Sequence, residues 1–128
     1  MEFTVKTTLN ASAKEIYDAW MNSESHSEMT GGEAEINDIV GTSFSAWDGY
    51  IEGQNIALEA NKRIVQSWRT TEFEESDEDS QIEILLEETD GQTNLTLIHT
   101  KLSEDGEQYI NGWKEHYFAP MKDYFSGN

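Results

Sequence analysis

Residues 105–125 carry a broad apolar stripe at the spacing of an α-helix. Side chains three or four positions apart lie on one face of a helix, so this pattern predicts a long helix with an apolar face. The stripe consists of Tyr109, Ile110, Trp113, Tyr117, Phe118, Met121, Tyr124 and Phe125. A helix this apolar must be covered by another element, and the rest of the chain has to supply a large apolar surface for it.

Pro120 is the only proline of the chain and lies inside this predicted helix. Proline has no backbone N–H, so it cannot donate to the carbonyl of His116, and we expect a kink near that position. Ser103 or Asp105 is the expected N-cap, because both side chains can accept a hydrogen bond from the first turn.

Alternating apolar and polar residues predict that strands form most of the chain before this helix. Phe3, Val5, Thr7 and Leu9 alternate with polar neighbours, which predicts a first strand at residues 2–9. Further strands are expected at residues 34–37, 42–46, 50–59, 63–71, 80–88 and 93–102.

Turn residues separate the predicted strands. The pairs Asp48-Gly49 and Asp90-Gly91 favour hairpin turns, since both residue types tolerate positive φ. Successive hairpins imply antiparallel pairing. The segment 72–79 holds six acidic side chains among its eight residues and is expected to be a solvated loop.

Two short helices are expected directly after the first strand. Ser12 can cap a helix at residues 13–22, while Glu15 reaches back to the cap amide. A second helix is expected at residues 24–29, before Gly31-Gly32. The element order, a strand, two helices, a run of strands and a long helix, indicates the α+β class. We expect one domain over residues 1–128.

Five sequence strings then occur in a characteristic order. They are AKEIYDAW (13–20), GTSFSAWDG (41–49, with Gly53 following), RIVQSWR (63–69), TNLTLIH (93–99), and GW (112–113) followed by YF (117–118). Together they resemble the family named for the C-terminal domain of the activator of heat-shock-protein-90 ATPase. That family lies within the START-like, birch-allergen-like (SRPBCC) superfamily. This chain departs from the family pattern at Thr42, where a second glycine is usual.

The resemblance implies a helix-grip fold. In that fold a curved antiparallel sheet of about six to seven strands wraps around a long C-terminal helix, and an apolar cavity lies between them. Members that stimulate the chaperone carry an additional N-terminal domain, which we do not expect here. Single-domain members are regarded as binders of small apolar ligands, and the family has no catalytic motif to carry over.

The net charge and composition of the chain limit the classes of partner that it can bind. The chain has 26 acidic and eight basic residues, a net charge of −18 and a pI near 4.2. Such a surface repels phosphate backbones and anionic lipids, so we expect neither nucleic-acid nor membrane binding. It is compatible with a basic protein partner, with simple solubility and with adaptation to high salt. The chain lacks cysteine, which excludes disulfides and fits a cytoplasmic protein.

Eight side chains are candidate cavity-lining residues, because aromatic walls with a few polar groups are typical of small-molecule sites. They are Trp20, Phe44, Gln66, Trp68, Leu97, His99, Trp113 and Tyr117. The alternative interpretation is that they are core residues that fill the space under the long helix. His99 shares a strand face with Leu95 and Leu97, so it is either a hydrogen-bonded core histidine or a polar contact for a ligand, with Tyr117 or Gln66 nearby.

No motif for metal binding, a cofactor or nucleophilic catalysis is present. The three histidines, His26, His99 and His116, fall on different predicted elements without paired-ligand spacing. The sequence therefore favours a module that binds a small apolar ligand. A protein-interaction module, acting as a chaperone co-factor, is the alternative. A hydrolase or cyclase, as among distant superfamily members, is a third alternative for which no residue argues.

Overall fold

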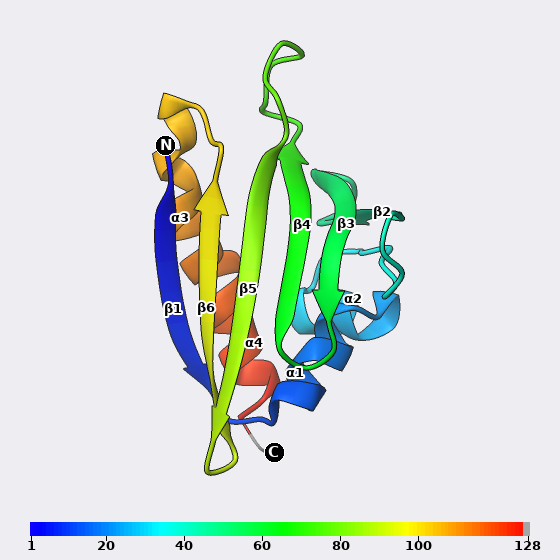
Figure 1. The fold of residues 1–128 in the computed structure, drawn as a ribbon, viewed down its shortest axis with the longest axis vertical. Helices are drawn as coiled ribbons and strands as arrows, with labels where there is room; N and C mark the ends of the chain where they lie inside the picture. The colour runs from blue at the N-terminus through cyan, green and yellow to red at the C-terminus, as the bar shows by residue number, and fades with distance from the viewer. Residues whose placement is uncertain (127–128) are drawn as a thin grey trace.

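The computed structural model describes residues 1–126, and within them six antiparallel strands form one sheet in the order β1-β6-β5-β4-β3-β2 (Figure 1). The strands are β1 (Phe3–Leu9), β2 (Ser43–Ala46), β3 (Ile51–Glu59), β4 (Arg63–Thr70), β5 (Ser80–Thr89) and β6 (Gln92–Thr100). The two short helices are α1 (Ala13–Trp20) and α2 (Ser23–Thr30). The predicted α+β helix-grip architecture is confirmed.

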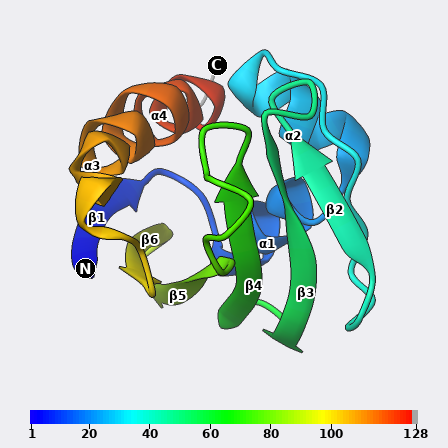
Figure 2. The same ribbon diagram turned by 90° about the horizontal axis from the view of Figure 1, so that it is seen from above.

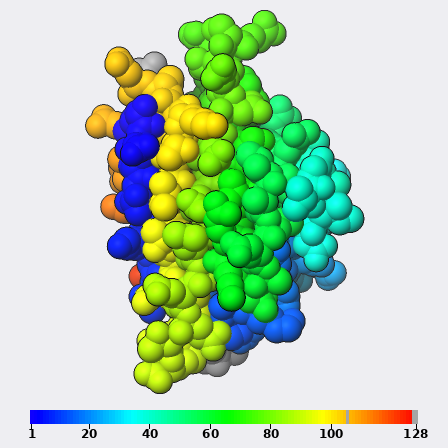
Figure 3. Space-filling model, viewed as in Figure 1, coloured from blue at the N-terminus to red at the C-terminus, as the bar shows by residue number. Residues whose placement is uncertain are grey.

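The terminal helical segment lies across the inner face of the curved sheet. Seen from above, the sheet bends around this segment, and α1 and α2 close the side formed by β3 and β2 (Figure 2). The opposite face of the sheet shows β1, β6, β5, β4 and β3 side by side, and the loop after β4 projects beyond the body of the molecule (Figure 3). Apolar burial is therefore concentrated between the sheet and the terminal helix.

Capping interactions set the bounds of the two short helices. The Ser12 hydroxyl accepts from the N–H of Glu15, and the Glu15 carboxylate accepts from the N–H of Ser12, so the predicted capping box is confirmed. The side chain of Asn22 caps α2, and Gly31 ends it with φ +86°. Glycine suits this end because the left-handed region carries no Cβ penalty for it.

The β5–β6 hairpin turns at Asp90 and Gly91, with φ of +53° and +82°, as their turn chemistry predicts. The pairing brings Ile82 opposite His99 and Ile84 opposite Leu97. Directly opposite residues share one face of the sheet, so these side chains lie together in the core. Leu95, Leu97 and His99 lie on one buried face of β6, as their alternation predicts.

One of the predicted strands does not form within the described residues. Residues 34–37 make a single bridge, between Glu35 and Ser45, rather than a strand. The side chains around the bridge are tied locally instead: the Ser23 hydroxyl bonds both the carbonyl and the N–H of Ile36. The Asn37 carbonyl accepts from Asn55. Because these groups are already satisfied, the segment runs beside β2 without a ladder.

The terminal helix is continuous but not uniform. It consists of a 3₁₀ turn (Glu104–Glu107), α3 (Gln108–Trp113), a π-helical turn (Lys114–Phe118) and α4 (Ala119–Tyr124). The N–H of Ala119 donates to the carbonyl of Lys114, five residues back. Pro120 follows at once and cannot donate, so the expected irregularity takes the form of a wider turn. Ser103 holds the N-cap position, although its side chain makes no capping bond.

The inner face of this helix is buried as its stripe predicts. Trp113, Tyr117 and Met121 are between 0% and 3% exposed. Tyr124, the last residue of α4, is the exception at 42%. Within residues 1–126, no helix is both long and apolar enough to cross a membrane.

Candidate functional site

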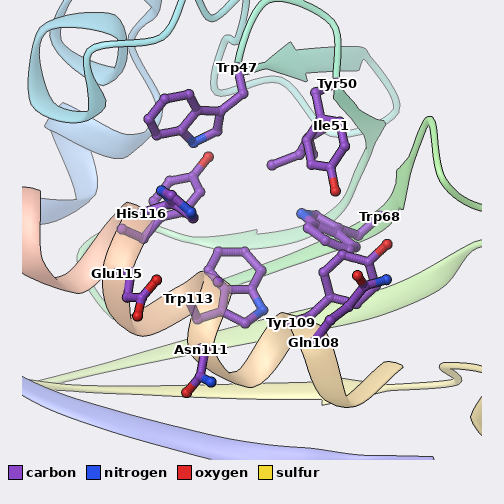
Figure 4. A pocket seen from close by; sticks show the side chains of 12 residues that line it. Trp47, Tyr50, Ile51, Trp68, Gln108, Tyr109, Asn111, Trp113, Glu115 and His116 are labelled. Carbon is purple, nitrogen blue, oxygen red and sulfur yellow. The ribbon is translucent and has the colours of Figure 1, made fainter. Parts of the chain in front are cut away.

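A cavity of about 460 Å³ opens between the terminal helix and the sheet. Its walls come from the β2–β3 turn, β3, β4 and the helix (Figure 4). The lining residues are Trp47, Tyr50, Ile51, Trp68, Gln108, Tyr109, Asn111, Gly112, Trp113, Glu115, His116 and Tyr117. Six of these twelve are tryptophan or tyrosine, so the cavity is walled mainly by aromatic rings.

The mouth and the interior of the cavity differ in character. Four polar residues of the helix, Gln108, Asn111, Glu115 and His116, are exposed and form one lip. Trp47 and Tyr50 are half-buried and form the opposite lip, whereas the remaining aromatic residues are buried. A molecule entering between the two lips would therefore pass polar groups before it reached an aromatic interior.

The conformation of the β2–β3 turn places Trp47 over the cavity. Trp47 and Asp48 both have a positive φ, +52° and +58°. Such φ values are unfavourable for residues other than glycine. Asp48 holds the turn, since its N–H and its carboxylate both bond the backbone of Glu33. Gly32 lies directly under the indole: a Cβ there would come within 2.6 Å of the Trp47 ring. The indole meets the His116 ring edge-on, with centroids 5.8 Å apart.

Trp113 is fixed through a chain of buried hydrogen bonds. Its Nε1 donates to Nδ1 of His99 over 3.0 Å, so His99 carries its proton on Nε2, which donates to the Ser80 hydroxyl over 2.9 Å. Ser80 in turn donates to the carbonyl of Trp68. Burial lowers the pKa of His99 to about 3. The ring is therefore neutral, and neither nitrogen is free for a ligand.

Tyr117 is held by a second histidine that sequence reasoning did not place here. Nδ1 of His26 donates to the carbonyl of Trp20 over 2.9 Å, which leaves Nε2 to accept from the Tyr117 hydroxyl over 3.0 Å. Burial lowers the pKa of His26, and the bond to Trp20 opposes this only in part. Burial also raises the pKa of Tyr117. Both groups are therefore neutral and act as a fixed pair.

Gln66 belongs to a third buried chain, behind the cavity. Its carbonyl oxygen faces Nε1 of Trp20 at 3.4 Å, and its amide donates to Asn55 over 2.9 Å. Asn55 then donates to the carbonyls of Asn37 and Ile39. This chain links α1, β4, β3 and the loop before β2, which gives it a structural role.

The hydroxyl groups of two further tyrosines of the wall also form hydrogen bonds. The Tyr109 hydroxyl shares a hydrogen bond of 2.7 Å with Thr70, and the Tyr50 hydroxyl donates to the carboxylate of Glu72. Burial and then the bond to Glu72 raise the pKa of Tyr50. Nε1 of Trp47 is buried and has no acceptor within the part of the chain that the structure describes.

The family model for "Activator of Hsp90 ATPase homolog 1-like protein" matches residues 10–126. This match spans the fold from the end of β1 to the end of the terminal helix and includes every residue that lines the cavity. The chain belongs to this family. The resemblance noted in the sequence is thus confirmed.

Two curated proteins are similar to most of this chain. An "Activator of 90 kDa heat shock protein ATPase homolog" from Dictyostelium discoideum is 29% identical over 125 residues, 95% of this chain and 32% of the relative. An uncharacterized protein from Schizosaccharomyces pombe is 24% identical over 119 residues, 92% of this chain and 35% of the relative. The chain therefore spans about a third of the length of these relatives.

Solved structures share the fold of this family member. An HSP90 activator from Plasmodium falciparum superposes with a TM-score of 0.89 at 20% identity, covering 98% of this chain and 96% of that one. The Aha1 dimer from Colwellia psychrerythraea gives 0.82 at 19% identity, covering 98% and 96%. At these identities the likeness concerns the fold alone.

Three of the eight candidate residues, Trp68, Trp113 and Tyr117, line the cavity. The other five, Trp20, Phe44, Gln66, Leu97 and His99, are buried but do not line the cavity. His99 and Gln66 bond protein groups, as the core interpretation of these residues expects. A ligand-contacting role for any of the eight stays a prediction.

Sequence reasoning missed Tyr50, Ile51 and Tyr109 as wall residues. A signal for two of them was available, because Tyr50 and Ile51 directly follow the predicted Asp48-Gly49 turn. A turn of this kind places its flanking aromatic side chains at one end of the sheet, beside the covering helix. Tyr109 was visible only as part of the helical stripe.

Proposed function

We propose that the protein binds a small, mainly apolar molecule in the cavity between the sheet and the terminal helix. The observation that supports this proposal is the cavity itself, about 460 Å³ in volume and walled by six aromatic rings. Small-molecule sites commonly have volumes of about 300–1,000 Å³, with largely apolar walls and a few polar groups. Family membership is compatible with a ligand-binding module of this kind.

The polar wall groups argue for an apolar ligand. The polar atoms of Tyr50, Tyr109, Trp113 and Tyr117 are bonded to protein groups outside the cavity. A polar ligand that lost its water in this interior would find few partners, and unpaired buried polar groups cost roughly 1–3 kcal/mol each. Apolar and aromatic ligands avoid that cost.

The test is titration with N-phenyl-1-naphthylamine, a neutral apolar dye, followed by dye emission and tryptophan quenching. Three of the four tryptophans line the cavity, so we expect saturable quenching with one site per chain. Ligand at a hundred times its dissociation constant should add about 2.7 kcal/mol to the free energy of unfolding.

Gly112 offers a matched variant for locating the site. It lines the cavity, and a Cβ there would meet no atom within 4 Å. Gly112→Leu should therefore fill part of the volume and weaken dye binding by roughly tenfold. Lys114→Leu adds the same side chain at an exposed position outside the lining and should leave binding unchanged. Equal loss in both variants, or no dye binding to the unmodified protein, would contradict the proposal.

A second candidate function is a co-factor of a heat-shock-protein-90 ATPase. It is favoured by the family match and by the name of the Dictyostelium discoideum relative. The net charge of −18 would speed association with a basic surface and make it sensitive to salt. The test measures the chaperone's ATPase rate with and without this protein at 50 and 300 mM salt. Unchanged rates at both salt concentrations would reject this function.

A further inference from the structure

We propose that the cavity selects organic cations, specifically an alkylammonium group on an apolar body. This inference rests on the proposed ligand-binding function and concerns the charge of the ligand that the same site prefers. Three features of the site support it: four of the wall rings bond their polar atoms outside the cavity, the wall contains no lysine or arginine, and carboxylates lie near the mouth.

Two rings of the aromatic wall bond their polar hydrogens to groups outside the cavity. Nε1 of Trp113 donates to His99 over 3.0 Å, and the Tyr117 hydroxyl donates to His26 over 3.0 Å. Neither histidine lines the cavity. These two rings therefore offer no N–H or O–H donor to the interior and present only carbon surface there.

Tyr109 and Tyr50 also bond their hydroxyl groups to residues outside the cavity. The hydroxyl of Tyr109 bonds Thr70 over 2.7 Å, and the hydroxyl of Tyr50 donates to Glu72. Both partners lie outside the wall of this cavity. Four of the six rings therefore bond their polar atoms outside the cavity, whereas Nε1 of Trp47 has no acceptor among the described residues and Nε1 of Trp68 faces the cavity in Figure 4. A cation placed over the face of one of these rings would gain about 0.5–2 kcal/mol.

Trp68 and Trp113 form the innermost part of this wall. Their ring centroids are 5.4 Å apart, and Tyr109 meets Trp68 edge-on at 5.0 Å. On the other side Trp113 packs against Tyr117 at 4.9 Å. These contacts fix the rings relative to one another, so a ligand would meet a preformed surface and not have to order it.

Charged groups near the mouth favour the same class of ligand. The twelve lining residues include no lysine or arginine, whereas Glu115 lies on the exposed lip. Glu72 accepts from Tyr50 on the opposite lip and places a second carboxylate close by. The net charge of −18 raises the local concentration of cations around the whole molecule. A carboxylate ligand would be repelled by all of these groups.

The decisive comparison uses benzyltrimethylammonium and neopentylbenzene, which differ only in a nitrogen that carries the charge. Each is titrated into the unmodified protein at pH 8, where imidazoles are neutral, in constant 150 mM salt. Binding is followed through the indole N–H signals in NMR spectra. We expect the cation to bind at least tenfold more tightly than its neutral isostere.

The outcomes separate this inference from the proposed function. Equal binding of both compounds would leave the apolar cavity supported and would overturn the preference for cations. Tighter binding of neopentylbenzene would overturn it too. Binding of neither compound, together with no binding of the neutral dye, would overturn both.

Fluorinated tryptophan tests the physical cause. Fluorine withdraws electron density from the ring face and changes its size little, so the attraction of a cation should fall with each fluorine. We expect the dissociation constant of benzyltrimethylammonium to rise about twofold or more from tryptophan to difluorotryptophan. That of neopentylbenzene should stay the same. An equal change for both compounds would assign the effect to packing and would contradict the inference.

Glu115→Gln tests the contribution of the lip. The substitution removes one charge at an exposed position and keeps the shape of the side chain. We expect twofold to threefold weaker binding of the cation and no change for neopentylbenzene. The matched control is Glu107→Gln, an exposed residue of the same helical segment outside the lining, which should have a smaller effect on either compound.

Discussion

The indole nitrogen of Trp113 donates to Nδ1 of His99 across 3.0 Å, joining the covering helix to β6 in the interior of the protein. Both side chains are almost completely buried, at 2% and 0% exposure. The bond therefore fixes the cavity wall and the tautomer of the histidine together. Both ring nitrogens of His99 are thus bonded within the core.

Removing this donor should destabilise the protein strongly. Trp113→Phe leaves Nδ1 of His99 without a partner and opens space in the core, so we expect a loss of about 3 kcal/mol or more in the free energy of unfolding. Urea unfolding followed by circular dichroism measures it.

Trp47→Phe is the matched control for that substitution. Nε1 of Trp47 bonds no acceptor among the described residues, and its ring is only half-buried. We expect a loss below about 1.5 kcal/mol, because no hydrogen bond is broken. Equal losses for the two variants would show that the bond to His99 contributes nothing measurable.

Lowering the pH should reduce the free energy of unfolding, because His99 has a lower pKa in the folded chain than in the unfolded one. Its pKa is about 3 in the folded chain and near 6.5 in an unfolded one. Between these values the unfolded chain binds the additional proton, so stability falls as the pH falls from 6.5 toward 3. The contribution of His99 alone should be a loss of about 1.4 kcal/mol at pH 5.5 relative to pH 7.5.

His99→Gln isolates this contribution from the titration of the 26 acidic residues. Glutamine can accept from Trp113 and donate to Ser80 but does not titrate. The difference in stability between the unmodified protein and the variant should shrink by about 1.4 kcal/mol between pH 7.5 and 5.5. A difference that stays constant with pH would mean that His99 titrates normally in the folded chain.

The fold could be predicted from the sequence because buried residues recur at the regular spacing of strands and helices. The alternation of Ile82, Ile84 and Leu86 and the stripe through Trp113 and Tyr117 both describe one buried face. Periodicity records which residues are inside but not which groups they bond. Residues 34–37 show the limit, since their pattern resembles a strand while the backbone groups of Ile36 and Asn37 bond side chains.

The site could be predicted only in part, for a related reason. His26 and Tyr117 are 91 positions apart, and Trp20 and Gln66 are 46 apart. No local pattern links such partners, because each polar residue is compatible with many contacts until the sheet and helix are assembled. The wall of the cavity also depends on the positive φ of Trp47, a backbone conformation that residue type does not reveal.

Gly53 should be among the least replaceable residues of the sheet. A Cβ on it would lie 1.9 Å from the carbonyl oxygen of Ser67 and 2.8 Å from the ring of Phe44. The backbone of Ser67 and the buried ring of Phe44 cannot both move to make room for this Cβ. Gly53→Ala should therefore lower the free energy of unfolding by about 3 kcal/mol or prevent folding. Thermal unfolding measures the effect. Gly112→Ala, at a helical position with nothing within 4 Å, should instead stabilise by about 0.5–1 kcal/mol.

Arg69 should determine how well the acidic loop at 72–79 is ordered. Its guanidinium donates to the carboxylate of Asp79 over 2.7 Å and to the carbonyls of Asp77 and Glu74 over 3.2 and 3.1 Å. It also lies over the ring of Phe73, 5.4 Å from the centroid. One side chain thus holds the loop at four points, and the loop has no strand or helix of its own.

Arg69→Met should therefore loosen the loop without unfolding the sheet. We expect a glutamyl endopeptidase to cut within the loop about tenfold faster, because local opening becomes easier while the core contacts remain. Mass spectrometry of the fragments locates the cut. Arg63 lies on the same strand as Arg69 and pairs with Glu83 on β5. Arg63→Met removes that ion pair and should leave the cleavage rate unchanged. Faster cleavage in both variants would indicate general loss of stability, and no change in either would mean that Arg69 does not order the loop.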